Sequence, residues 1–276
     1  MNLDTQSASA YTIQELASLM TRAFDNYIGG NLKMDKAAFL SFIAHEGIDL
    51  NLSQVVLKDE MPCGLALVAR RGWRVRLAAM GIVREASGQG VGKWFMQQLM
   101  EQARGRGEHH YELEVIEQNT PAVKLYEGSG FAVMRRLVGF SLDNPDGMPS
   151  PDLQEVDIFT VAQALVQFEE PDLPWQMDGM TIARFGMPYR AYKLAKAYAV
   201  ISNPEPPMIT LRTMIVPPEY RDMGYATRLL LALFAQHPGK SWRVAPVWPE
   251  EYAYIFEQLG FAPAALSQFQ MGLTLQ

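Results

Sequence analysis

The sequence predicts an α/β protein made of two tandem domains, and three observations carry this prediction. One pattern occurs in residues 81–131 and again in residues 215–261: an apolar strand, a glycine turn, an amphipathic helix, a strand, a helix and a final Gly-Phe. Repetition on this scale indicates duplicated domains. A length of 276 residues is enough for two separate cores. Pro, Gly, Asn and Asp cluster at 143–152 as in a linker, so we place the domains at residues 1–145 and 150–276.

The composition excludes several classes of protein. The chain is 49% hydrophobic and 20% charged, as expected of a soluble folded protein. It has no apolar run near the roughly 20 residues that cross a bilayer. A net charge of -6 leaves no excess of Lys and Arg for phosphates, so we expect no nucleic-acid partner. The N-terminus lacks a signal-peptide pattern and Cys63 is the only cysteine, so we expect a cytoplasmic protein with no disulfide and no membrane partner.

The first half opens with two predicted helices. Thr12 and Glu15 form a capping box ahead of apolar residues at helical spacing, which predicts a helix over about 13–27. Asp35 is placed to cap a second helix, and Gly47 is placed to end it. Before the glycine turn, we expect three short strands near 54–59, 63–69 and 76–83.

The glycine turn joins the third of these strands to a helix. Gly88, Gly90 and Gly92 let the backbone approach a ligand closely, and the free N–H groups of a helix N-terminus favour a phosphate or pyrophosphate. Lys93 adds a cation. The spacing fits neither a Walker A loop nor a dinucleotide-binding fingerprint. Turns of this kind also serve as tight connections, so the residues downstream decide between the two interpretations.

The downstream residues follow a second pattern. Glu114 lies in the strand "LEV", Asn119 is placed to cap the next helix, and Tyr126 lies in that helix just before the final Gly-Phe. Together with the glycine turn, this pattern resembles the GCN5-related N-acetyltransferases, the GNAT superfamily. The resemblance covers most of residues 12–142 and, in the second half, about 209–275.

The two glycine turns match the family's cofactor loop, Arg/Gln-x-x-Gly-x-Gly/Ala, to different degrees. The first copy has Gly90 and Gly92, but Ser87 stands where Arg or Gln is usual. The second copy matches the loop fully, with Arg221, Gly224 and Ala226.

The resemblance implies, in each domain, a mixed and mostly antiparallel twisted sheet flanked by helices, with a splayed pair of parallel strands where acetyl-CoA meets an amine. An ammonium must lose a proton before it attacks, and the departing thiolate must gain one. By position in the family pattern, Tyr126 is the expected acid and Glu114 the expected base, with Glu85 and Glu117 as substitutes for the base. The residues expected to bind acetyl-CoA are Ile82, Val83, Ser87, Gly88, Gln89, Gly90, Val91, Gly92, Lys93, Asn119, Ala122 and Tyr126.

The second half lacks the groups that this chemistry needs. Aligning the two final Gly-Phe pairs puts Pro249 at the position of Asn119 and Phe256 at the position of Tyr126, and neither side chain can donate a proton. We therefore expect an N-acetyltransferase active in the first domain, with an amine of a small molecule or peptide as acceptor. The alternative is a non-catalytic acyl-CoA-binding sensor or interaction module.

Two further features have a functional and a structural interpretation. Eight carboxylates and no Lys or Arg lie between Asp146 and Asp178. This segment is either a solvated connector or an acidic wall that attracts a cationic acceptor. His109 and His110 have no neighbouring Cys or Asp, so we interpret them as structural residues and expect no metal site.

Overall fold

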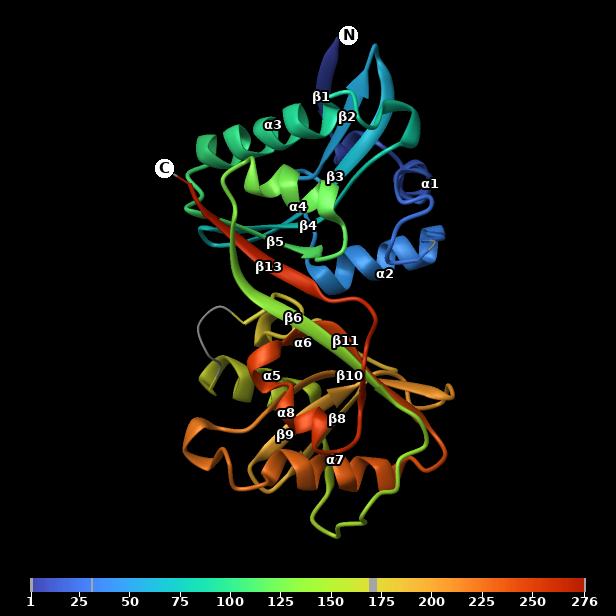
Figure 1. Ribbon diagram of the computed structural model, residues 1–276, viewed down its shortest axis with the longest axis vertical. Helices are drawn as coiled ribbons and strands as arrows, with labels where there is room; N and C mark the ends of the chain where they lie inside the picture. The colour runs from blue at the N-terminus through green and yellow to red at the C-terminus, as the bar shows by residue number, and fades with distance from the viewer. Residues whose placement is uncertain (1, 31, 169–172, 276) are drawn as a thin grey trace. The chain divides into compact units, whose positions relative to one another are not determined.

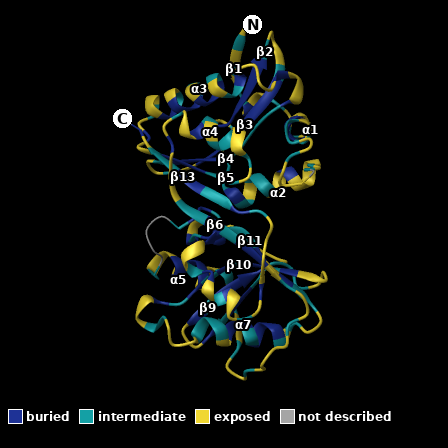
Figure 2. Cartoon of the chain, viewed as in Figure 1, coloured by how far each residue is buried: buried dark blue, intermediate teal, exposed yellow. Residues whose placement is uncertain are grey.

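The computed structural model of the chain (Figure 1) contains two compact units. Unit 1 consists of Met1–Arg135 and Gln268–Gln276, and unit 2 consists of Arg136–Ser267. Each unit has its own hydrophobic core, with buried strands and mostly exposed outer helix surfaces (Figure 2). The structure describes residues 2–30, 32–168 and 173–275.

Unit 1 is a mixed sheet flanked by helices. Its helices are α1 (Ile13–Ala23), α2 (Lys36–Glu46), α3 (Val91–Gly105) and α4 (Thr120–Glu127), with the short 3-10 helices η1 (Ala8–Ala10) and η2 (Arg84–Ala86). Its strands are β1 (Leu3–Ser7), β2 (Gln54–Lys58), β3 (Met61–Arg71), β4 (Arg74–Ile82), β5 (His110–Ile116) and β13 (Gln268–Thr274). They lie in the order β1-β2-β3-β4-β5-β13, and β4 and β5 form the parallel pair among antiparallel neighbours.

Local sequence signals account for most of these boundaries. The predicted capping box is present, because Thr12 accepts a hydrogen bond from the Glu15 backbone N–H and Glu15 reaches back to the Thr12 backbone N–H. Gly47 ends α2 in the left-handed region, as expected. In contrast, α1 ends at Ala23, four residues earlier than predicted. The strand β1 was not predicted, because its sequence, LDTQS, has a single apolar residue.

Alternating residues of β4 show which helices cover each face of the unit 1 sheet. A side chain at Gly81 would meet Ala23 and Phe24 at the end of α1. The neighbouring residues Met80 and Ile82 instead lie near the start of α3 and near α4. Because adjacent side chains of a strand point to opposite faces, α1 covers one face and α3 and α4 cover the other (Figure 1).

The parallel strands β4 and β5 separate part-way along their length. They pair from Arg74 and His110 to Leu77 and Leu113, and the pairing stops there. Beyond this point β4 pairs with β3 on its other side, and β5 pairs with β13. The register between β3 and β4 shifts at the same place, leaving Ala78 as a bulge residue. Since a bulge bends its strand, it explains why the two strands diverge as the resemblance implied.

Unit 2 repeats this plan with a different front end. Its helices are α5 (Ile158–Phe168), α6 (Gly179–Ile182), α7 (Tyr225–Gln236) and α8 (Tyr254–Glu257), with η3 (Pro218–Tyr220) and η4 (Glu250–Tyr252). Its strands are β7 (Gln154–Val156), β8 (Arg190–Leu194), β9 (Ala197–Ile201), β10 (Met208–Ile215), β11 (Ser241–Pro249) and β12 (Ala262–Pro263), joined by part of β6 (Ala132–Leu142). The parallel pair is β10 and β11, which pairs only from Met208 to Leu211, again beside a register shift.

The last strand of each repeat belongs to the sheet of the unit that is built mainly from the other repeat. The strand β6 follows α4 of unit 1, but its residues Leu137–Leu142 pair with β11 of unit 2. The strand β13, which follows the second Gly-Phe, pairs along its length with β5 of unit 1. The predicted linker at 143–152 therefore lies inside unit 2, and the units do not follow the repeats residue by residue. Within the described residues, no helix combines the length and apolar character needed to cross a bilayer.

Candidate functional site

The glycine turn of unit 1 forms an open cradle at the start of α3. Gly88 and Gly90 have positive φ angles of 74° and 82°, and a side chain at either position would meet no atom within 4 Å. Gly90 is the N-cap of α3, and no side chain caps the first N–H groups of the helix. An uncapped N-terminus of a 15-residue helix, with exposed Lys93 in its first turn, suits a phosphate group.

The cradle adjoins the opening between β4 and β5. A side chain at Gly92 would lie 3.6 Å from Leu125 of α4, 3.9 Å from Met80 and 4.0 Å from Ile82. The start of α3 thus meets Leu125 of α4 and the end of β4 on one face of the sheet. Of the predicted cofactor residues, this brings together Ile82, the 88–93 loop and the 119–126 segment.

The backbone N–H and carbonyl of Val83, a predicted cofactor-binding residue, both have hydrogen-bond partners within the protein. Its N–H donates to the carbonyl of Cys63 at 2.8 Å, and its carbonyl accepts from Ala86 at 3.0 Å. Its side chain is buried. The backbone groups of Val83 therefore have partners within the protein, whereas the Ile82 side chain lies beside the start of α3.

Tyr126 is a buried residue of α4, next in sequence to Leu125, which lies near the start of α3. Its side chain is 8% exposed, and its ring contacts Phe131 edge-on with centroids 6.0 Å apart. Burial raises the pKa of the Tyr126 hydroxyl, and Tyr27 raises it further. The hydroxyl is therefore protonated at neutral pH, as a proton donor must be.

Tyr27 is a site residue that the sequence analysis missed. It lies in the turn after α1, where Gly29 packs against its ring and against Ile116 at the end of β5. A side-chain hydrogen bond joins Tyr27 to Asn119, while the Asn119 oxygen accepts the Ala122 N–H at 3.4 Å as the cap of α4. Burial raises the pKa of Tyr27. No local motif marks this residue, because its role depends on contacts with residues about 90 positions away.

Glu114 is held by a buried arginine. Arg76 donates from Nε and Nη2 to the Glu114 Oε2 atom, both at 2.8 Å, and its Nη1 lies 2.7 Å from Glu46 Oε2. Burial alone would lower the pKa of Arg76, but the charges of Glu114 and Glu46 outweigh it and raise the pKa. The side chains of Arg76 and Glu114 are each 4% exposed. The predicted base is thus an oriented carboxylate on the face of the sheet that α2 covers.

The other predicted candidates lie elsewhere in unit 1. Glu85 is exposed in η2, and Glu117 follows the end of β5. The His109 ring stacks at a tilt on Trp73 with centroids 4.6 Å apart, and the backbone N–H groups of His109 and His110 donate to the Trp73 carbonyl. In the described parts of the chain, no three His, Cys, Asp or Glu side chains come together as metal ligands.

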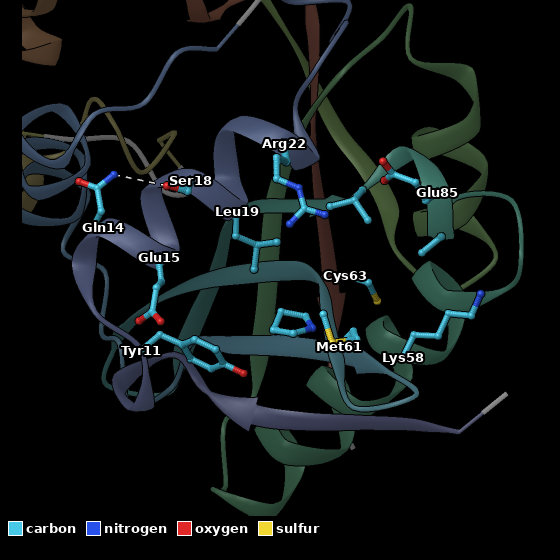
Figure 3. A pocket seen from close by; sticks show the side chains of 13 residues that line it. Tyr11, Gln14, Glu15, Ser18, Leu19, Arg22, Lys58, Met61, Cys63 and Glu85 are labelled. Atoms are coloured by element: carbon cyan, nitrogen blue, oxygen red, sulfur yellow. Dashed lines mark hydrogen bonds between the residues drawn. The ribbon is translucent and has the colours of Figure 1, made fainter.

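A cavity of about 610 Å³ lies on the α1 face of unit 1, between α1 and the turn from β2 to β3 (Figure 3). Its charged lining residues are Glu15, Arg22, Lys58 and Glu85. Neither Tyr126 nor the glycine cradle lines this cavity. We place the candidate site at the strand opening instead, because the start of α3, Leu125 of α4 and the end of β4 come together there.

Unit 2 has a cavity at the equivalent place but lacks the acid. The cavity has a volume of about 310 Å³ and is lined by the end of β10, the 220–227 loop and residues near α8. Phe256 is fully buried, packed against the rings of Phe140, Trp248 and Phe261. Pro249 precedes η4, and a 3-10 turn and a four-residue helix stand where unit 1 has the single α4.

The carboxylates between Asp146 and Asp178 belong to unit 2, and several have structural roles there. Asp157 accepts the Phe159 N–H at the start of α5, and Asp178 caps α6. Glu155 lies 3.5 Å from Arg190. Three of the eight carboxylates, Glu169, Glu170 and Asp172, lie outside the described residues. These contacts favour the interpretation of the segment as a structural connector.

Comparisons with known proteins agree with this geometry. The family model described as Acetyltransferase (GNAT) family matches residues 18–131. N-alpha-acetyltransferase 30 of Schizosaccharomyces pombe is 30% identical over 106 residues, which are 38% of this chain and 66% of that protein.

Two solved structures are similar over almost the whole chain. A GCN5-related N-acetyltransferase from Sphaerobacter thermophilus has a TM-score of 0.70 at 13% identity, covering 99% of this chain and 96% of that one. A tandem GNAT protein from the clavulanic acid biosynthesis pathway has a TM-score of 0.67 at 14% identity, covering 100% and 99%. At these identities the likeness establishes the fold, and its coverage includes both units.

Proposed function

We propose, from the premise that this chain belongs to the acetyltransferase (GNAT) family, that unit 1 transfers an acetyl group from acetyl-CoA to a primary amine. One observation carries the proposal. The strands β4 and β5 part beside an uncapped helix N-terminus, and α4, which packs there through Leu125, carries the buried Tyr126. Unit 2 has the opening without the hydroxyl, so we assign catalysis to unit 1 alone.

The residues at the opening fit acetyl-CoA. The space beside Gly88 and Gly90 leaves their N–H groups accessible to a pyrophosphate, and Lys93 supplies a cation nearby. The facing edges of β4 and β5 beyond Leu77 and Leu113 have no strand between them, so their backbone groups can bind the amides of an extended pantetheine arm.

The side chains of unit 1 supply the two proton transfers of the reaction. Bound acetyl-CoA presents its acetyl group as a thioester. Glu114 accepts a proton from the incoming ammonium, directly or through a water, and the neutral amine then attacks the carbonyl carbon. The C–S bond breaks and the Tyr126 hydroxyl donates its proton to the departing sulfur, while the nitrogen loses its second proton as the amide forms and so restores the Tyr126 hydroxyl. Tyr27 and Asn119 hold the start of α4 in place beside that hydroxyl.

The acceptor is an amine carried by a small molecule or a peptide. The name of the fission yeast relative, an N-alpha-acetyltransferase, favours an α-amino group among these. Release of free thiol from acetyl-CoA, measured with α-amino peptides, polyamines and amino acids as acceptors, tests the proposal. If the protein binds acetyl-CoA and releases no thiol with any acceptor, the alternative of an acyl-CoA sensor is correct.

We expect Gly90→Trp to abolish binding of acetyl-CoA in unit 1. An indole at this position fills the space where the pyrophosphate would lie, so affinity should fall roughly 100-fold or more while the fold persists. Titration calorimetry measures the affinity, and thermal unfolding checks the fold.

The control for backbone strain is Gly107→Trp, since Gly107 has a similar φ of 76° and open space around it in the turn after α3. Gly224→Trp tests the equivalent loop of unit 2. Unchanged affinity in Gly90→Trp, with loss in Gly224→Trp, would place the cofactor in unit 2.

We expect Glu114→Gln to slow the reaction most strongly at low pH. Removing the base should lower kcat/KM by about 10² near pH 7, and the deficit should shrink toward pH ~10, where the acceptor amine deprotonates by itself. A pH–rate profile measures this change.

Glu112→Gln is the matched control, because Glu112 lies two residues away on β5 and pairs with Arg74 at 3.0 Å. If the deficit of Glu114→Gln is the same at every pH, Glu114 is a structural partner of Arg76 and not the base.

A further inference from the structure

We propose that Lys58 is part of the phosphate-binding site at the glycine loop of unit 1. Lys58 and Gln89 together anchor this loop and supply a positive charge, as Arg221 alone does in the loop of unit 2. This inference rests on the proposed function, since it assigns further residues to the same cofactor site. It starts from the difference between Ser87 and Arg221 at equivalent positions of the two loops.

The two loops have the same backbone form. Gly90 and Gly224 begin their helices with φ angles of 82° and 74°. Gly88 and Asp222, two residues earlier, also have positive φ angles of 74° and 60°. A 3-10 helix precedes each loop. The loops can therefore be compared position by position, which pairs Ser87 with Arg221 and Gln89 with Met223.

In unit 2, one side chain both anchors the loop and supplies a cation. The Nε atom of Arg221 donates to the carbonyl of Val216, just after β10, at 3.2 Å. Its side chain carries a cationic guanidinium group. Met223 is 61% exposed and has a thioether as its only polar group, a weak acceptor. Arg221 thus connects the loop to the strand end and brings a positive charge.

In unit 1, two residues divide these tasks. Gln89 Nε2 donates to the carbonyl of Glu85 at 2.8 Å, which anchors the loop to η2. Gln89 Oε1 accepts a hydrogen bond from Lys58 Nζ at 2.6 Å. Ser87 is exposed and uncharged, so it brings no positive charge to the loop. The charge comes instead from Lys58, at the end of β2 and 31 positions before Gln89.

The ammonium of Lys58 is suited to a pyrophosphate. It has three donors, and the bond to Gln89 uses one of them. The loop N–H groups at the start of α3 favour an anion at the same place. In Figure 3, Lys58 lies at the end of the α1-face cavity where Glu85 of η2 also lies. The fold therefore brings a lysine from another strand to the loop that lacks its own arginine.

Lys58→Met tests the inference by its effect on affinity for the phosphate part of the cofactor. We expect the Kd of acetyl-CoA to rise about 10-fold, since a hydrogen bond to a charged group is lost. Dephospho-CoA, which keeps the pyrophosphate, should be weakened to the same extent. The kcat/KM for S-acetylpantetheine, which has no phosphate, should stay unchanged. Lys36→Met, at the exposed first residue of α2, is the matched control.

A second substitution in the same protein tests the division of tasks. Adding Ser87→Arg to Lys58→Met should recover about 3-fold or more of the lost affinity, because it restores the arrangement of unit 2. If Lys58→Met binds acetyl-CoA as Lys36→Met does, or if Ser87→Arg recovers nothing, the inference is wrong. Failure of the unmutated protein to bind acetyl-CoA would instead overturn the proposed function.

Discussion

Replacing Tyr126 with Phe should reduce kcat by roughly 10² or more, because the substitution removes the proton that the departing thiolate needs. The effect should fall on kcat, with little change in the Kd of acetyl-CoA or in thermal stability, since the ring and its packing on Phe131 are retained. Burial raises the pKa of Tyr126, so its ionisation should not reduce the unmutated rate between pH 7 and pH 10. Steady-state rates over this pH range measure both effects.

Two further variants make the result specific to Tyr126. Tyr111→Phe removes another buried phenol hydroxyl, 1% exposed and packed on the same Phe131, and should keep its activity. Phe256→Tyr, added to Tyr126→Phe, should restore nothing, because Phe256 is fully enclosed by aromatic rings in unit 2. A Tyr126→Phe rate within a few-fold of the unmutated rate would show that another group protonates the sulfur.

Met271→Ala should destabilise unit 1 by about 2–5 kcal/mol, the usual cost of removing a buried methionine side chain. Met271 lies in β13 near the end of the chain, is fully buried, and belongs to the core of unit 1. Hydrogen exchange should therefore accelerate in its partner strand, His110–Ile116, although this strand lies some 155 positions away in the sequence. Mass spectrometry of peptides from both units measures this effect.

Thr274→Ala is the matched control, because Thr274 is exposed on the same strand and its replacement should change stability by less than about 0.5 kcal/mol. Exchange in β9 and β10 of unit 2 should stay as it is in both variants. Faster exchange in β9 and β10, with β5 protected, would show that the end of the chain folds with the second repeat.

The elements that sequence reasoning located are those with local causes. Thr12 and Glu15 form the cap of α1 within four residues, and Gly47 ends α2 by its own backbone freedom. The fold class is confirmed as well, because the period of apolar residues reports which face of each element is buried. The end of α1 was predicted four residues too late, because the turn that replaces its last turn packs against Ile116 of β5.

The residues of the candidate site also fall into those with a local sequence pattern and those placed by long-range contacts. The glycine loop, Asn119 and Tyr126 lie on two short segments with recognisable spacing, so the sequence alone identified them as candidates. Tyr27 and Lys58 have no motif of their own. Their importance comes from one hydrogen bond each, to Asn119 and to Gln89, and each bond joins residues far apart in the chain.

The sequence by itself determined that the chain is duplicated, that each copy contains a glycine loop at a helix start, and that Tyr126 of the first copy is replaced by Phe256 in the second. These are properties of residue type and spacing within one segment. The tertiary structure alone decided that β6, at the end of the first repeat, completes the sheet of unit 2, and that β13, at the end of the second repeat, completes the sheet of unit 1. These pairings join residues far apart in the chain, so local propensity does not specify them. The choice depends on long-range contacts such as the burial of Met271 in the core of unit 1.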